Sequence, residues 1–286
     1  MTVATQSTLL GAWREHWPEY LIEGWALGTF MLSASIVVVL LESRQLPFRE
    51  LIPSPLLRRM LVGMAMGLTA FGLIYSRWGR RSGAHMNPAV TLAFLRLRLV
   101  RPIDGLFYML AQTIGGTLGV LAGFLLTAGM LAAPDARWVV TVPGTCGPSV
   151  AFGAEFLMAM FLMLVVLRFS STPTLRKYTG CAAALMVAIF ITIAAPCSGM
   201  SINPARTLAS AIPSRVWTAV WVYLLAPPLG MLAAAELHRW QSHGLLRHCA
   251  KLCHDNRTRC IHCGYTPSEG AAKVPQPELT GWRSHV

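Results

Sequence analysis

Long stretches of apolar residues alternate with short polar connections along most of this chain. A helix needs about 20 predominantly apolar residues to cross the hydrocarbon core of a bilayer, and six stretches approach or reach that length. They lie near residues 21–42, 60–76, 106–128, 149–168, 179–196 and 217–237. The pattern predicts an all-α membrane protein with six transmembrane helices, and the even number of spans puts both termini on one side.

Composition agrees with this class, since the 286 residues are 54% hydrophobic and 13% charged, against about 25% charged residues in soluble domains. The net charge of +12 could indicate nucleic-acid binding, but the positive charges sort by predicted topology. With the N-terminus inside, the inner segments hold 17 of the 24 Lys and Arg residues: Arg14, six between 77 and 101, three between 168 and 177, and seven after 238. This bias follows the positive-inside rule. We therefore predict cytoplasmic termini, contact with the lipid bilayer and its anionic headgroups, and no nucleic-acid partner.

Residues 1–20 contain Glu15 and Glu19 and lack the continuous apolar region of a signal peptide, so we predict a retained cytoplasmic N-terminus. The seven cysteines are too few and too unevenly spaced to predict a disulfide framework. Four lie in the tail, where cytoplasmic thiols stay reduced. For Cys197 two interpretations stay open: a thiol reachable from the outer mouth, or a buried packing thiol.

An internal repeat divides the chain. Residues 82–93 read SGAHMNPAVTLA and residues 198–209 read SGMSINPARTLA, so eight of twelve positions match. Each copy follows the second span of its half, and three spans per half is an odd number. The second half therefore enters from the opposite face, as in the inverted 3+3 repeats of many transporters. We predict a first repeat over 21–130, a second over 148–240 and a cytoplasmic tail over 241–286.

The repeated segments have the pattern of helix starts, because Asn is a favoured N-cap and Pro is favoured at the first helical position. The apolar runs that follow, 88–97 and 204–212, are about 10 residues long and reach roughly 15 Å, half of the ~30 Å hydrocarbon core. We predict two re-entrant half-helices that enter from opposite faces and meet near the midplane. The pore motifs are Asn87, Pro88, Ala89, Asn203, Pro204 and Ala205.

Two helix N-termini that meet in the membrane would direct two positive dipole ends at one point. Non-helical backbone is tolerated at that depth only inside protein or beside a cavity, which the loop carbonyls would line. The Asn87 and Asn203 amides would add hydrogen-bond donors at the centre. Such a track suits neutral molecules that donate and accept hydrogen bonds, and it excludes protons and ions.

These motifs resemble the major intrinsic protein family, the aquaporins and glycerol channels. The resemblance covers about residues 20–240 and rests on GAHMNPAVT (83–91) and MSINPARTL (200–208), with support from AQTIGGTLG (111–119) and WVYLLAPPLG (221–230). It implies a passive channel rather than an enzyme, a homotetramer with one pore per subunit, and no required cofactor. We expect a bacterial-type member in a bacterial inner (plasma) membrane.

The resemblance also implies a selectivity filter around the Arg of the second motif, here Arg206. Its neighbours are Met200, Ile191 and a second-span residue, which is Met66 if the following Gly-Leu pair is aligned and Gly67 if raw spacing is used. This set departs from that of water-specific members and lacks the aromatic wedge of typical glycerol channels. It predicts an atypical filter that passes water and small neutral solutes such as glycerol, urea and peroxide.

Glu23 and Glu155 lie early in the first span of each half. An ionisable residue inside the membrane is functional by default, so an ion-coupled secondary transporter is the alternative class. The resemblance implies a structural role instead, in which each carboxylate holds the backbone N–H groups of a re-entrant loop. For His85 we favour loop packing at the cytoplasmic mouth over gating.

The tail segment 248–263 reads HCAKLCHDNRTRCIHC. Its cysteines, Cys249, Cys253, Cys260 and Cys263, have the spacing of two ligand pairs, and His248, His254 and His262 are alternative ligands. Tetrahedral zinc accepts such ligands. Two interpretations stay open: a zinc site, with a channel regulated by metal, or a basic tail with incidental thiols. Residues 264–286 are polar and Pro-rich, and we predict disorder there.

Overall fold

The computed structural model describes residues 8–241, 249–255 and 257–267, and the secondary structure in these ranges is helical. Six helices are long and apolar enough to cross a membrane, which confirms the predicted fold class. They are α1 (Leu9–Glu42), α3 (Pro55–Tyr75), α6 (Pro102–Leu126), α7 (Gly147–Ser171), α8 (Thr179–Ser198) and α10 (Val220–Gln241).

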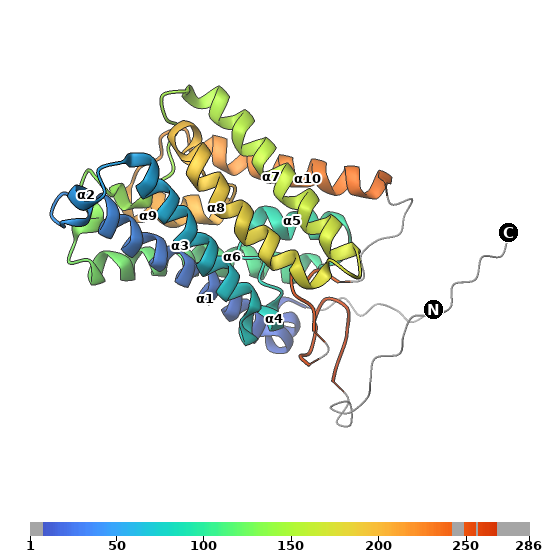
Figure 1. The fold of residues 1–286 in the computed structure, drawn as a ribbon. Coiled ribbons are helices and arrows are strands. Elements are labelled where there is room, and N and C mark those ends of the chain that lie inside the picture. Colours follow the sequence, from blue (N-terminus) through green and yellow to red (C-terminus); the bar gives the residue numbers. More distant parts are fainter. Residues whose placement is uncertain (1–7, 242–248, 256, 268–286) are drawn as a thin grey trace, which may run out of the picture.

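Shorter helices fill the connections. Two of them, α5 (Pro88–Arg96) and α9 (Pro204–Ser214), are the half-helices that the repeat predicts. The others are α2 (Phe48–Leu51), α4 (Arg77–Ser82) and three 3-10 turns, η1 (Met130–Ala132), η2 (Arg137–Val139) and η3 (Arg176–Tyr178). We call the end of the bundle with α4 and residues 249–255 and 257–267 the tail side, and the opposite end the α2 side (Figure 1).

Helix α1 begins at Leu9, twelve residues before the predicted span, with the Thr8 side chain accepting a hydrogen bond from the N–H of Gly11. Its 34 residues span roughly 51 Å, well beyond a ~30 Å hydrocarbon core. Helix α1 therefore includes residues 9–20, which the apolar pattern left outside the first span. The polar residues that hid it from the apolar pattern form ion pairs on the tail side, where Glu19 contacts Arg81 and His16 contacts Asp104.

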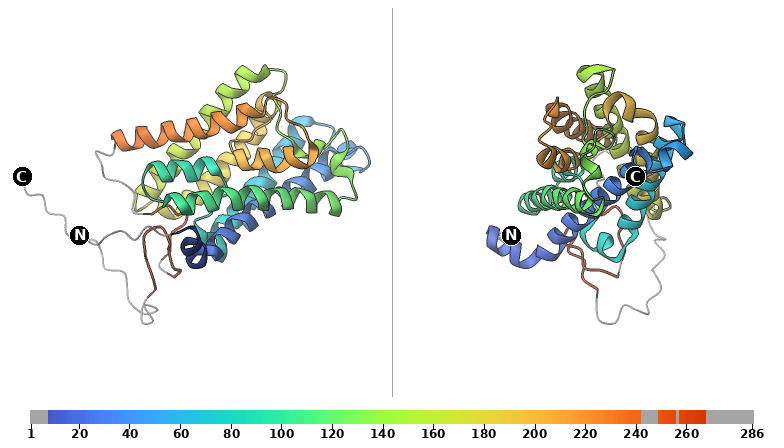
Figure 2. Two further views of the ribbon diagram at one scale, coloured as in Figure 1. Left: turned by 180° about the vertical axis from the view of Figure 1, so that it is seen from behind. Right: turned by 90° about the vertical axis from the view of Figure 1, so that its left-hand side faces the viewer.

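The helices pair according to the inverted repeat. The first and third spans of each half pack together, α1 with α6 and α7 with α10, while α3 packs against α8 across the two halves. The half-helices cross over, because α5 lies mainly on α10 and α9 mainly on α6. Figure 2 shows α5 and α9 nearly end to end between these long helices. Small residues allow the close packing: a Cβ on Gly28 of α1 would lie only 2.7 Å from the carbonyl oxygen of Gly115 of α6.

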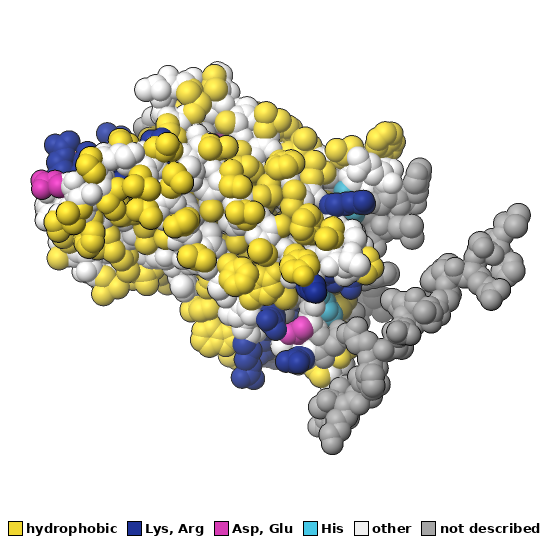
Figure 3. All heavy atoms as spheres, viewed as in Figure 1, with side chains coloured by type: hydrophobic (Ala, Val, Ile, Leu, Met, Phe, Trp, Pro, Cys, Tyr) yellow, Lys and Arg dark blue, Asp and Glu magenta, His cyan; other side chains and the backbone are white. Residues whose placement is uncertain are grey.

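The outer surface is apolar where a bilayer would surround it (Figure 3). Large side chains are exposed midway along several helices, including Leu68 at 70%, Ile114 at 60% and Ile193 at 67%. Lys and Arg side chains gather near the two ends of the bundle on the face shown. In water such a surface would be unstable, so the distribution identifies an integral multi-pass membrane protein.

Candidate functional site: the centre of the bundle

The two half-helices begin at the repeated asparagines. The Asn87 side chain accepts a hydrogen bond from the N–H of Ala89 at 2.9 Å, and Asn203 accepts one from the N–H of Arg206 at 3.2 Å. Pro88 and Pro204 occupy the first helical positions, where a missing N–H costs nothing. The local sequence thus determines where each half-helix starts.

The same asparagines join the two halves. The Nδ2 atom of Asn87 donates to the carbonyl of Ile202 at 2.7 Å, and Nδ2 of Asn203 donates to the carbonyl of Met86 at 2.7 Å. Each side chain therefore caps its own helix and binds the loop of the other. An amide nitrogen carries two N–H groups, and both asparagines also line the central cavity.

Buried carboxylates hold the loops before the half-helices. Glu23 is fully buried and accepts hydrogen bonds from the N–H groups of His85 at 3.0 Å and Met86 at 2.7 Å. Hydroxyl and amide groups complete its shell, from Ser82 at 2.7 Å and Gln112 at 2.9 Å. These bonds support a loop in which Ala84 and Met86 have positive φ angles, a conformation that costs roughly 1–3 kcal/mol per residue.

Glu155 does the same for the second loop. It accepts from the N–H groups of Ser201 at 2.9 Å and Ile202 at 2.5 Å, and from the Ser198 hydroxyl at 2.8 Å. Met200 and Ile202 have the positive φ angles here. Both carboxylates thus have the surroundings of structural anchors. Ser82 and Ser198, the first residues of the two repeat copies, each donate a hydrogen bond to one of these carboxylates. This role was not assigned from the sequence, although the duplication of the two serines could have indicated it.

A cavity of about 310 Å³ runs beside the two asparagines. Every fourth residue of α3 faces it, at Val62, Met66, Ala70 and Ile74. Met66 lies in this row and is 2% exposed. Gly67 is not among the lining residues and faces α8, where an added Cβ would lie 2.9 Å from the carbonyl oxygen of Ala184.

The other residues of the expected filter, Ile191, Met200 and Arg206, line the same cavity as Met66. The guanidinium of Arg206 donates to the carbonyl of Val139 at 2.9 Å. The α6–α7 connection forms a further part of the cavity wall, through Ala136, Val139 and Val140. The sequence did not indicate these residues. An irregular connection has no periodicity that would show which of its residues face inward.

Cys146 and Cys197 are joined in a disulfide, which corrects both interpretations of Cys197. Their Cα atoms are 5.2 Å apart, within the range of bridged pairs. The bond links the start of α7 to the end of α8 on the α2 side, close to the re-entrant loop. The two residues are 51 positions apart, and only the packing of α7 against α8 brings them together.

The tail residues form a cluster with a different composition from the one predicted. The ligand atoms of Cys249, His254, Cys260 and Cys263 all lie within 4.8 Å of one another. Cys253 was a wrong choice, because it packs against the apolar core next to Leu252 instead. His262 is turned to the loop before α5, and His248 lies outside the described residues.

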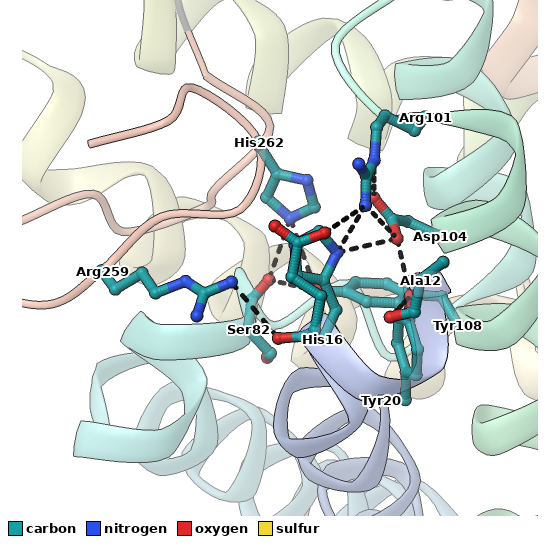
Figure 4. Close-up of polar contacts among 10 residues, drawn as sticks. Ala12, His16, Tyr20, Ser82, Arg101, Asp104, Tyr108, Arg259 and His262 are labelled. Atoms are coloured by element: carbon teal, nitrogen blue, oxygen red, sulfur yellow. Dashed lines mark hydrogen bonds and ion pairs between the residues drawn. The ribbon is translucent and has the colours of Figure 1, made fainter. Parts of the chain in front are cut away.

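The tail also contacts the first re-entrant loop directly. Nε2 of His85 donates to the carbonyl of Ala250 at 2.7 Å, and the N–H of Leu252 donates to the carbonyl of Gly83 at 3.1 Å. Burial and the neighbouring His85 lower the pKa of His262 to about 4, so its neutral ring donates from Nε2 to the Ser82 carbonyl at 3.0 Å. Figure 4 shows His262 beside Ser82 and Tyr108.

Six spans, two half-helices that meet at paired asparagines, and one arginine beside a shared cavity define a multi-pass membrane protein built from two inverted repeats. The chain matches the family model described as "Major intrinsic protein" over residues 19–238. It belongs to that family, as the sequence motifs indicate.

Individual relatives and a solved structure agree with this family assignment. The chain is 40% identical to aquaporin NIP6-1 of Arabidopsis thaliana over 178 residues, which cover 61% of this chain and 56% of that protein. It is 33% identical to nodulin-26 of Glycine max over 62% of this chain and 64% of that protein. The chain thus matches little more than half the length of such relatives. The aquaglyceroporin from Plasmodium falciparum has the same fold, with a TM-score of 0.66, 19% identity and coverage of 78% of this chain and 95% of that one.

Proposed function

We propose that this protein is a passive channel for water and small neutral solutes that excludes protons and ions. The observation that carries this proposal is the reciprocal bonding of Asn87 and Asn203 beside the cavity. It directs the N-termini of α5 and α9 at one point, where their dipoles repel cations while the amides and loop carbonyls can bind a neutral molecule.

The walls support a substrate range beyond water. Met66, Ile191 and Met200 surround the cavity with aliphatic and thioether side chains, and Arg206 provides a fixed positive charge. A wall of this kind offers few hydrogen bonds to a solute, so discrimination rests on size and charge. We therefore propose Met66, rather than Gly67, as the α3 member of the filter, and glycerol, urea and peroxide as candidate solutes.

The distribution of charge and thiols supports an orientation with the tail side in the cytoplasm. Arg77, Arg80 and Arg81 near α4 lie on that side, in line with the positive-inside rule. The Cys146–Cys197 disulfide lies on the α2 side, and disulfides persist in oxidising compartments outside the cytoplasm. A bacterial inner membrane and a homotetramer remain predictions; the exposed apolar surface is compatible with lipid and with neighbouring subunits.

An ion-coupled transporter would need a carboxylate free to bind the coupling ion. Glu23 and Glu155 instead accept backbone N–H groups of both re-entrant loops. Binding an ion there would break the bonds that support those loops. The geometry thus favours the passive channel over the coupled transporter.

Stopped-flow light scattering on proteoliposomes tests the proposal. The full chain should speed osmotic water flux over empty liposomes, pass at least one of glycerol, urea and peroxide, and leave a proton gradient intact. Measurements are made both with Zn²⁺ supplied and with a chelator, because Leu252, next to the Cys/His residues of the tail, lines the cavity. Water flux equal to that of empty liposomes in both conditions contradicts the channel, and solute accumulation driven by an ion gradient supports the transporter.

A further inference from the structure

We propose that residues 249–255 and 257–263 are a plug over the tail-side mouth of the cavity. One tetrahedral cation, zinc by its chemistry, would clamp this plug by binding Cys249, His254, Cys260 and Cys263. The plug is a regulatory addition to the proposed channel and rests on that function. Cation binding would hold the mouth closed, and cation loss would release it.

The ligand atoms already have nearly the spacing of a tetrahedral site. With zinc–sulfur bonds of about 2.3 Å, neighbouring ligands in a tetrahedron lie about 3.8 Å apart. Here the sulfurs of Cys249 and Cys260 are 3.4 Å apart, and Nε2 of His254 lies 3.3 Å from the sulfur of Cys263. All four ligand atoms fall within 4.8 Å.

The ligand set itself selects the cation. Three thiolates and one imidazole form a closed structural zinc site, whereas Mg²⁺ and Ca²⁺ prefer oxygen ligands. Cys249 and Cys260 are 7% and 1% exposed, so water has little access to compete for that side of the site. Thiols this close but without a cation would be held together by weak hydrogen bonds alone.

The plug is joined to the pore loop by specific contacts. The carbonyl of Ala250 accepts from His85, which lines the cavity, and Leu252 donates to the carbonyl of Gly83. Gly83 has a φ of +111°, and a Cβ there would lie 3.3 Å from Cγ of Lys251. The tail segment therefore packs directly on the loop that precedes α5.

The side chain of Leu252 is the part of the plug that would close the cavity. This side chain lines the central cavity and packs in one cluster with Ile74, Ala84 and Ala183, which line the same end. It is only 6% exposed, so it fills the mouth instead of standing beside open water. The neighbouring Lys251 is fully buried and donates from Nζ to the Arg259 carbonyl at 3.0 Å, a contact within the tail.

Ion pairs and peripheral hydrogen bonds hold the far end of the plug. Arg80 of α4 contacts Asp255 at 3.6 Å, and Arg259 donates to the carbonyl of Glu15 at 3.2 Å beside the His16–Asp104 pair (Figure 4). These partly exposed contacts contribute little by themselves. A segment this short has too few apolar residues to stay folded alone, so the cation cross-link decides whether the plug stays in place.

Metal content of the purified full chain tests the site. Inductively coupled plasma mass spectrometry should find about one zinc per chain, the content expected of a closed structural site. Cys260→Ser should lose most of it, while Cys253→Ser, a cysteine of the same tail outside the cluster, should retain it. Replacement by Co²⁺ should give the visible bands of a tetrahedral thiolate site in the wild type and in Cys253→Ser only.

Water flux through the same proteins tests the closure. At free Zn²⁺ about 100-fold above its dissociation constant, binding to the closed state raises the closed-to-open ratio by as much as about 100-fold. The water flux of the wild type with Zn²⁺ should therefore be several-fold lower than that of the chelated protein. Cys260→Ser should be fast in both conditions and Cys253→Ser should respond as the wild type. Leu252→Ala should keep zinc and lose most of the zinc response, because its side chain no longer fills the mouth.

Three results would overturn the proposal and leave the channel intact, and a fourth would contradict the channel. Equal zinc content in Cys260→Ser and Cys253→Ser overturns the ligand set, and a Cys249–Cys260 disulfide found in mass spectra of the protein purified without reductant overturns the cation clamp. Fast flux that is equal with and without Zn²⁺ overturns the plug. Absence of flux in the wild type, Cys260→Ser and Leu252→Ala under both conditions contradicts the proposed channel itself.

Discussion

Arg206 donates a hydrogen bond from its guanidinium to the carbonyl oxygen of Val139 at 2.9 Å, which fixes a positive charge on the wall of the central cavity. The carbonyl belongs to the connection between α6 and α7, so a loop far away in the sequence orients the charge. In the first repeat Val90 occupies the matching position, and it also lines the cavity. The two halves thus share a fold but differ in charge.

Replacing Arg206 with Val, the residue of the matching position, should admit cations. Two like charges about 4 Å apart repel by roughly 4 kcal/mol at an effective dielectric constant near 20, so the loss should raise proton or ammonium flux by about tenfold or more. A fluorescent pH indicator inside chelator-treated proteoliposomes measures the change. Arg215→Gln, at the other end of α9, is the control, and an equal leak from both variants would contradict the role of Arg206.

Replacing Glu155 with Gln should destabilise the second re-entrant loop. The amide group of Gln keeps only one acceptor oxygen for the N–H groups of Ser201 and Ile202, and the lost charged hydrogen bonds contribute about 1.5–3 kcal/mol. Thermal unfolding in detergent should show a lower midpoint, and Glu23→Gln should behave alike. Glu236→Gln, half-exposed on α10, should shift the midpoint little. A Glu155→Gln midpoint equal to that of the control would rule out the anchor.

Removing the disulfide should lower stability on the α2 side. Cys146→Ser with Cys197→Ser should cost about 2 kcal/mol or less, the lower end of the usual range, because α7 and α8 stay close in the membrane. The thermal midpoint measures the loss, and peptide mapping without reductant detects the bond in the wild type. Cys181→Ser, a free exposed cysteine, should have no effect. Peptide maps without the cross-linked pair would refute the disulfide.

Met66→Ala and Gly67→Ala should show which of the two residues belongs to the selectivity filter and which packs α3 against α8. The first removes a side chain from the cavity wall, so glycerol flux should rise while the fold persists. The second places a methyl group 2.9 Å from the Ala184 carbonyl oxygen and 3.0 Å from Cβ of Ala188, so overpacking should cost about 1–3 kcal/mol with the solute preference unchanged. Solute-resolved swelling and thermal unfolding measure both effects. A solute preference altered only in Gly67→Ala would reverse the assignment.

The sequence by itself determined those helices that nearby residues specify. Apolar length gave the six spans, and the Asn-Pro pairs gave the two half-helix starts, because a cap acts within three residues of its own position. The duplication in two halves of three spans was enough to require the inversion. The start of α1 at Leu9 was missed, since its polar residues are stabilised by ion pairs with distant elements.

Only the tertiary structure decided contacts that depend on helix rotation and chain path. It directed Met66 to the cavity and Gly67 to α8, a choice that a shift of one residue reverses because neighbouring positions on a helix point about 100° apart. It also joined Cys146 to Cys197 and placed His254, not Cys253, in the tail cluster. Residue types and spacing specify what a side chain can bind, but the packing of distant segments determines which partners come within reach.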